Sequence, residues 1–550
     1  MKKLVSNLLL IAVIAFGMAS CTNAQKMIDA ADQIDIKCNP EVLEVIAGNI
    51  DATVSVTFPP EYFLPKATLE VTPVLLYVGG EAVGKPFVYQ GEKVTDNYKT
   101  VTKAGATITE KVHFDYVPGM EKSELVGRAK VYYKGAEFVY PADIKIADGA
   151  NTTYMLVKRA GNVAFKKDNY QDVIVTTAEG QIKYKVNSSE VRNSELKGTS
   201  VKEFLAALDA ANANERSTVK STEIVAYASP EGAEKLNNKL SGNRSQSASK
   251  AWNKITKGHD ALDPSVKSVG EDWEGFQQLV SESNIEDKEL ILRVLSMYSD
   301  PAVRENEIRN MSQVFTALKG EVLPELRRAR LIANVETKNY TNEELLDILK
   351  NNEKILDEEA LLRVASVAQD NAQKESIYQK AIERFNSSRA MYNLAALYLN
   401  EGKVSKAEAG LAELNAADPD VINAKGVVAL RKDDFGTAES LFRKAGTPEA
   451  KKNLGIVLIL TGQYEEAAQV LKDVDGCCHN TVLAYILTDQ LDKAMESAHC
   501  GDPKVWYLKA IVAARQGKVS EMKTYLERAY KNPSLQARAA KDIEFAAYDL

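Results

Sequence analysis

A small residue recurs through the C-terminal part of the chain at spacings of 35, 31, 29 and 27 residues. Its positions are Ala372, Ala407, Ala438, Ala467 and Ala494. This spacing is typical of paired α-helices, because a small side chain lets the two helices of a pair approach closely. A single pair cannot bury its apolar face alone, so the pairs must stack. The sequence therefore predicts an α-helical solenoid over residues 337–550.

Alternating apolar and polar residues dominate the first part of the chain. Alternation with a period of two turns one face of a strand toward a core. The clearest segments are 52–58, 68–71, 107–116 and 131–140, the last a hairpin with Lys134 and Gly135 at its turn. An all-β sandwich is therefore predicted for residues 34–149.

Between these regions, strand and helix patterns alternate, which predicts an α+β domain over residues 150–336. Strands are expected at 181–187, 221–228 and 330–336, helices at 200–211 and 236–255, and a long helical insertion up to residue 323. The chain is thus expected to be multidomain.

The N-terminus has the pattern of a secretory signal, with Lys2 and Lys3 ahead of an apolar run at 8–16. This run ends in Met-Ala-Ser-Cys, which resembles the bacterial lipoprotein lipobox. The resemblance implies removal of residues 1–20 and acylation of Cys21, with palmitate among the acyl groups, followed by a tether over residues 21–33. Several acyl chains would hold the chain on a membrane. The alternative is ordinary signal cleavage that leaves Cys21 as a thiol.

A second resemblance lies in the predicted α+β domain. The segment 224–232 reads Ile-Val-Ala-Tyr-Ala-Ser-Pro-Glu-Gly, and Asn237, Leu240, Ser241 and Arg244 follow it. Their register resembles the signature of OmpA-like peptidoglycan-binding domains. In that family an Asp and the Arg together hold the amino and carboxylate groups of diaminopimelate, which implies peptidoglycan or another envelope partner as the ligand.

Ser229 stands where the family has the Asp, so the ammonium group of such a ligand loses its countercharge. Glu231 is the nearest acid that could reach the same place. For Arg244 two interpretations stay open, a clamp for a carboxylate or a solvated arginine on an exposed helix face. Asn237 is a candidate ligand contact or a local cap. The candidate ligand-binding residues are Ser229, Glu231, Asn237 and Arg244.

The repeats resemble the tetratricopeptide consensus at residues 393–398 and 453–455 and at the Gly that follows each, Gly402 and Gly462. This resemblance implies that the concave face of the stack is free to hold an extended peptide or another protein. We expect every consensus residue, Asn393 and Asn453 included, to serve core packing.

Three cysteines lie close together in the repeats, Cys477, Cys478 and Cys500, with His479 and His499 beside them. An antiparallel helical pair between them would bring its two open ends together. A disulfide from Cys477 or Cys478 to Cys500, free buried thiols and a Zn²⁺ site are the three interpretations, and no metal is the expected state.

The net charge and the lack of catalytic motifs narrow the class of function. A formal charge of -7 does not indicate a nucleic-acid-binding face. We find no nucleophile elbow, phosphate loop or His-Glu-x-x-His motif, so neither an enzyme nor a cofactor is expected. The expected function is a periplasm-facing outer-membrane lipoprotein that acts as a scaffold. The alternative is an assembly factor or subunit of a surface fimbria or secretion complex that does not bind peptidoglycan.

Overall fold

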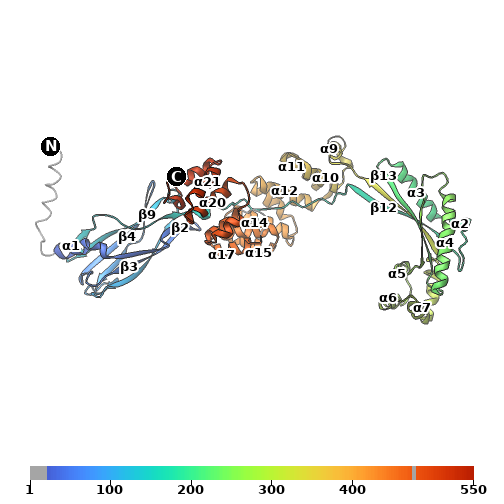
Figure 1. The fold of residues 1–550 in the computed structure, drawn as a ribbon, viewed down its shortest axis with the longest axis horizontal. Coiled ribbons are helices and arrows are strands. Elements are labelled where there is room, and N and C mark those ends of the chain that lie inside the picture. Colours follow the sequence, from blue (N-terminus) through green and yellow to red (C-terminus); the bar gives the residue numbers. More distant parts are fainter. Residues whose placement is uncertain (1–20, 474–478, 550) are drawn as a thin grey trace. The chain divides into compact units, whose positions relative to one another are not determined.

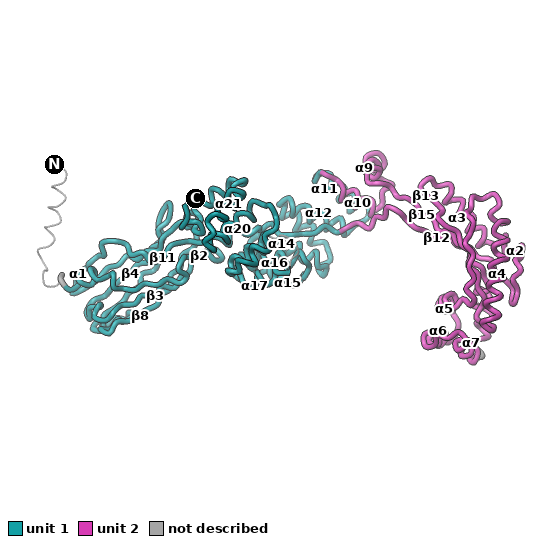
Figure 2. Tube along the Cα trace, in the orientation of Figure 1, with its two compact units in different colours: residues 1–166, 370–550 teal, residues 167–369 magenta. Residues whose placement is uncertain are grey.

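The computed structural model describes residues 21–473 and 479–549, and these form two compact units (Figure 2). The composite unit comprises residues 1–166 and 370–550, and the central unit comprises residues 167–369. No helix in the described residues is long and apolar enough to cross a membrane. Cys477 and Cys478 lie outside the described residues, so the predicted disulfide to Cys500 stays a prediction.

The N-terminal part of the composite unit is built of β-strands, as predicted (Figure 1). Their bounds are β1 Asp35–Asn39, β2 Val42–Ile46, β3 Asn49–Phe58, β4 Ala67–Tyr77, β5 Gly80–Val83, β6 Phe87–Gly91, β7 Lys99–Val101, β8 Ala106–Asp115, β9 Ser123–Tyr133, β10 Ala136–Val139 and β11 Ile144–Asn151. Strand β3 pairs with β1 and β8, and β9 pairs with β4 and β11. The predicted hairpin joins β9 to β10, and Lys134 and Gly135 at its turn both have positive φ.

Residues 21–33, which were predicted from the sequence to form a tether, are helical in the structure. Helix α1 (Cys21–Asp29) is followed by a 3₁₀ turn, η1 (Ala31–Gln33). Ala24, Met27 and Ile28 of α1 are buried in an apolar cluster of the β region, because they lie at helical spacing on one face. The hydroxyl of Tyr62 also donates to the Met27 carbonyl at 2.7 Å.

The C-terminal part of the composite unit is a stack of helices, as predicted, but it begins at Asn371, and residues 337–369, which were predicted to open it, belong to the central unit. Their bounds are α11 Asn371–Phe385, α12 Ser388–Asn400, α13 Val404–Ala412, α14 Pro419–Arg431, α15 Phe435–Ala445, α16 Pro448–Leu460, α17 Tyr464–Leu471, α18 His479–Leu487, α19 Leu491–Ser497, α20 Pro503–Arg515, α21 Val519–Ala529 and α22 Pro533–Ala539. The pairs are α12–α13, α14–α15, α16–α17, α18–α19 and α20–α21. The 3₁₀ turn η4 (Ile543–Phe545) follows the last helix.

The recurring alanines mark the second helix of each pair, with one exception. The side chains of Ala407, Ala438, Ala467 and Ala494 are fully buried, and each lies four residues after the N-cap residue of its helix. Ala372 lies only two residues after its N-cap Asp370 and is exposed, so its place in the series was predicted wrongly. Met522, at 0% exposure, holds the equivalent place in α21.

The β region and the helices of the composite unit share one apolar core. Polar contacts reinforce this junction, since Glu544 accepts hydrogen bonds from Asn151 at 2.9 Å and from Thr153 at 2.8 Å. Arg515 of α20 donates to the same carboxylate. Burial makes the largest single contribution and raises the pKa of Glu544. The hydrogen bonds and charge of Arg515, together with the hydrogen bonds from Thr153 and Asn151, outweigh it, so the pKa lies below its usual value.

The central unit has a four-stranded mixed sheet in the order β12-β15-β13-β14. Its elements are β12 Val173–Lys183, α2 Asn193–Leu196, α3 Thr199–Ala213, β13 Ser217–Ala228, α4 Glu234–Ile255, β14 Ser265–Glu271, α5 Trp273–Glu282, α6 Lys288–Met297, α7 Pro301–Asn310, α8 Ser312–Glu321, β15 Arg328–Lys338, α9 Asn342–Asn351, η3 Glu353–Ile355 and α10 Glu358–Val367. The ring centres of Phe204 in α3 and Trp252 in α4 lie 5.7 Å apart, in the core between these helices and the sheet.

Two predictions for this region were wrong. Strand β14 interrupts the stretch expected to be helical up to residue 323, and it pairs in parallel with β13, so its backbone groups are satisfied by the sheet. The β12 strand also begins at Val173, well after residue 150. Residues 150–166, predicted to open this domain, belong to the composite unit.

Candidate functional site

The four candidate ligand residues do come together around one pocket of the central unit. Ser229 and Glu231 follow β13, and Asn237 and Arg244 lie on the helix α4 that comes next. The pocket encloses about 400 Å³ and is also lined by Arg309, Lys319 and Arg327. A strand end followed directly by a helix therefore brings the motif residues to one place, as the sequence register indicated.

Arg244 is not a solvated arginine on an exposed helix face. Its side chain is 0% exposed, and its guanidinium donates to the carbonyls of Ser188 at 3.0 Å, Tyr227 at 2.9 Å and Lys185 at 3.2 Å. The guanidinium carbon also lies 5.1 Å from the centre of the Tyr184 ring. Burial lowers the pKa of Arg244 to about 10. The residue thus joins α4 to the β12 and β13 ends while one edge lines the pocket.

Glu231 lies beside Ser229 in the pocket. Its carboxylate accepts a hydrogen bond from the Ser229 hydroxyl at 2.7 Å and another from Arg327 Nε at 2.9 Å. The Arg327 ion pair is largely shielded, with side-chain exposures of 11% and 20%. Glu231 therefore reaches the place predicted for it, but its charge is already balanced by Arg327.

Asn237 holds the loop ahead of α4. Its amide donates to the Gly232 carbonyl at 3.0 Å and to a Glu271 carboxylate oxygen at 2.8 Å. Because the side chain is buried and its amide N–H groups are engaged within the protein, the local-cap interpretation fits Asn237 better than direct ligand contact.

Cations outnumber anions in the pocket lining. Its charged residues are four cations, Arg244, Arg309, Lys319 and Arg327, and one acid, Glu231. Glu305 pairs with Arg309, whereas Lys319 is exposed on α8. Such a lining favours an anionic group, and a carboxylate matches the planar donors of arginine. The sequence did not reveal Arg309, Lys319 and Arg327, because they come from α7, from α8 and from the residue just before β15, all far along the chain.

A second feature is an extended segment that lies along the solenoid of the composite unit. We call residues 156–166 the strap. Its backbone is held by asparagines from the first helices of the pairs, and these form what we call the asparagine face: Asn393, Asn423, Asn453 and Asn480. The chain itself therefore occupies the asparagine face, although the strap lies more than 200 residues away from these asparagines in the sequence.

Three of these asparagines each bind both backbone groups of one strap residue. Asn480 accepts from Lys158 N–H at 2.8 Å and donates to its carbonyl at 3.1 Å, and Asn393 binds Lys166 in the same way at 2.7 and 2.9 Å. Asn453 accepts from Asn162 N–H at 2.7 Å and donates to its carbonyl at 2.9 Å. Asn393 and Asn453 are thus backbone ligands, and the expectation that they serve only packing was wrong.

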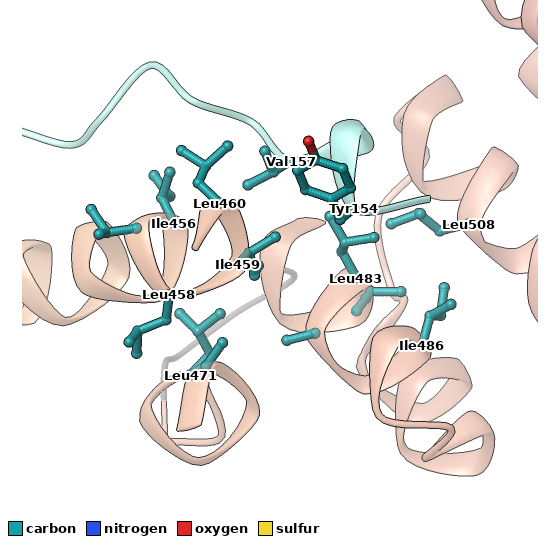
Figure 3. Packing of buried hydrophobic residues seen from close by; sticks show 14 of the residues in the cluster. Tyr154, Val157, Ile456, Leu458, Ile459, Leu460, Leu471, Leu483, Ile486 and Leu508 are labelled. Atoms are coloured by element: carbon teal, nitrogen blue, oxygen red, sulfur yellow. The ribbon is translucent and has the colours of Figure 1, made fainter. Parts of the chain in front are cut away.

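Apolar contacts and a buried histidine hold the start of the strap. Figure 3 shows Tyr154 and Val157 among side chains of the repeat helices, including Leu460 and Leu483. The Nε2 of His479, at 5% exposure, lies 2.7 Å from the Leu156 carbonyl, which requires a proton on that nitrogen. Burial lowers the pKa of His479 to about 4, so the ring is neutral at pH 7.

This histidine makes the composite unit sensitive to acid. The unfolded chain protonates His479 near its ordinary pKa of 6.5, whereas the folded chain does so only near 4. Stability is therefore fully present above pH 6.5 and falls toward pH 4, by about 2 kcal/mol between pH 7 and pH 5. Urea unfolding at both pH values should show this loss in the wild type and a smaller one in His479→Gln. An equal loss in the two proteins would contradict the assignment.

No metal-binding group of three or more His, Cys, Asp or Glu side chains exists within residues 21–473 and 479–549. Cys500 lies half-buried just after α19. Its predicted partners are not among the described residues, so the interpretation of this cysteine as part of a disulfide is untested.

No protein-family model matches the chain, and no curated protein matches it in sequence. Several solved structures match parts of the chain at low TM-scores. A tetratricopeptide repeat protein from Parabacteroides merdae matches with 14% identity and a TM-score of 0.30, over 37% of this chain and 91% of that one. Cut9, in the APC/C complex Cut9-Hcn1, matches with 13% identity and a TM-score of 0.30, over 48% and 58%. Yeast Tom70 matches with 14% identity and a TM-score of 0.27, over 64% and 80%.

Proposed function

We propose that this chain is a non-catalytic scaffold of the bacterial envelope, anchored in the outer membrane through acylated Cys21 and facing the periplasm. Its central unit is an OmpA-like domain that binds a carboxylate-bearing ligand, either peptidoglycan or an envelope partner. Its helical repeats serve protein interaction. The observation that carries the proposal is the basic pocket around Arg244, at the place where the OmpA-like motif positions its ligand.

The folded α1 helix supports a close anchor. The lipobox cysteine is its first residue, and Met27 and Ile28 pack into the β region a few residues later. A chain acylated at Cys21 would therefore hold the β region near the lipid headgroups, without a long flexible tether between them.

The pocket supports carboxylate recognition better than recognition of a zwitterion. Lys319 offers positive charge at its rim, Arg309 is paired with Glu305, and the one acid of the lining, Glu231, is paired with Arg327. Stem peptides of peptidoglycan carry several carboxylates, so the pocket can bind them without the ammonium contact of the family. The Glu231 pairing equally favours the alternative, an assembly factor or subunit of a surface fimbria or secretion complex that takes an acidic protein segment instead.

Sedimentation with purified peptidoglycan separates these two functions. The test protein is the mature chain with Cys21→Ser, which removes the lipid. We expect it to sediment with the wall material, and we expect Lys319→Glu to weaken this binding roughly tenfold, because reversing one charge at the pocket rim turns attraction into repulsion.

The matched control is Lys202→Glu, which makes the same charge change on the exposed face of α3. It should bind as the parent does. If the parent protein fails to sediment, peptidoglycan is not the ligand and the assembly function becomes the better proposal. If both lysine variants bind equally weakly, the effect is one of net charge and the pocket is not the site.

A further inference from the structure

The strap is bound mainly through its backbone, and this has a chemical consequence. The asparagine amides at Asn393, Asn453 and Asn480 contact N–H and C=O groups that every non-proline residue carries. Contacts of this kind select an extended chain but not its sequence. The asparagine face can therefore hold an extended peptide, and the strap is the extended segment that it holds in this structure.

Side chains at the two ends of the strap add selectivity. Lys158 Nζ lies 2.5 Å from a carboxylate oxygen of Asp502, and Lys166 Nζ lies 2.5 Å from one of Asp418. Both acids are N-cap residues of first helices, so the repeats fix their positions. Burial alone would raise the pKa of Asp418, yet the hydrogen bond from Lys166 holds it below its usual value. Two lysines eight residues apart thus match two fixed carboxylates.

The middle of the strap must be small. Gly161 has a φ of +74°, and a Cβ atom built there would lie 2.8 Å from a Val427 methyl. Next to it, Arg431 Nε donates to the Ala160 carbonyl at 2.9 Å. A ligand of this face therefore has a lysine, a glycine three residues later, and a second lysine five residues after the glycine.

We propose that the asparagine face is a peptide-binding site that the strap keeps closed, and that a partner enters it by displacing the strap with an extended segment of the same pattern. The strap has the advantage of being covalently attached, which gives it an effective concentration on the order of millimolar. A free peptide of equal intrinsic affinity therefore binds only weakly until the strap is loosened. Opening of the strap would regulate the site without any change in the asparagines.

The test uses the mature full chain with Cys21→Ser and a fluorescent synthetic peptide with the sequence of residues 153–167. The opened protein carries Lys158→Glu and Lys166→Glu, which turn both end contacts into repulsion and leave the asparagine face intact. We expect the opened protein to bind the peptide at least about tenfold more tightly than the wild type. Adding Asn453→Ala to the opened protein should abolish the gain.

The matched control is Lys167→Glu, an exposed lysine that follows the strap directly, and it should bind the peptide as the wild type does. Hydrogen exchange on the wild type gives a second readout that does not depend on the variants folding. Saturating peptide should speed exchange at the amides of Lys158, Asn162 and Lys166. The proposal is overturned if the folded, opened protein binds no better than wild type, or if saturating peptide leaves these amides protected.

Discussion

Replacing Arg244 with alanine is expected to destabilise the central unit by about 3 to 5 kcal/mol. The guanidinium is fully buried, and its removal leaves the carbonyls of Ser188, Tyr227 and Lys185 without their donor. It also removes the contact with the Tyr184 ring and opens a cavity. Because stability of this size is a large part of what a domain possesses, the central unit should lose its structure under mild denaturing conditions.

Urea unfolding, monitored by hydrogen exchange in residues 167–369, measures this loss of stability. Arg293→Ala, on the exposed face of α6, is the matched control and should shift the transition little. Arg244→Lys should recover only part of the stability, since an ammonium group cannot reach three carbonyls with the planar geometry of a guanidinium. An alanine variant as stable as Arg293→Ala would show that these hydrogen bonds contribute little.

The sequence predicts the parts of this fold that depend on local periodicity. Strand β3 follows from strict alternation over residues 52–58, and the second helices follow from alanines such as Ala438, which must be small where two helices touch. The motif at 224–244 also places Ser229, Glu231, Asn237 and Arg244 together, because a strand end and the next helix start are always neighbours. These are contacts between residues close in sequence.

What the sequence does not reveal depends on contacts between distant segments. Arg327 balances Glu231 from 96 residues away, and no local pattern indicates that pair. The same holds for Asn453 and Asn162, which are 291 residues apart. A buried asparagine in a helix is a signal in its own right, since an amide there needs a partner. Its partner could have been any extended segment, and only the structure identifies the strap.

Burial also reversed the interpretation of single residues. For Arg244 the sequence left an exposed position open, yet three carbonyls from two other segments surround it. The segment after Cys21 is polar overall, but Ala24, Met27 and Ile28 fall on one helical face and bury it. In both cases composition was misleading, because the direction in which a side chain points matters more than the average of its neighbours.

Exchanging Asn453 for leucine should destabilise the composite unit by about 3 kcal/mol and release the middle of the strap. Leucine has the same branching and the same number of side-chain heavy atoms as asparagine, but it has no polar atoms. The Asn162 N–H then loses its acceptor, and Asn423 Oδ1 loses the donor that lies 2.9 Å away. Asn423 itself still donates to the Asn162 carbonyl at 3.0 Å, so that group stays satisfied. Thermal unfolding measures the loss of stability, and hydrogen exchange at Asn162 measures the release.

Asn400→Leu is the matched control. Asn400 is the exposed last residue of α12, so the substitution makes the same chemical change outside the asparagine face. It should leave both readouts within a few tenths of a kcal/mol of the wild type. If Asn453→Leu lowers stability while the Asn162 amide remains protected, the asparagine supports helix packing and not the strap. If exchange at Asn162 rises by the full amount and the repeats stay folded, the strap is a separable ligand of the solenoid, since only an independently bound segment can detach while its binding face persists.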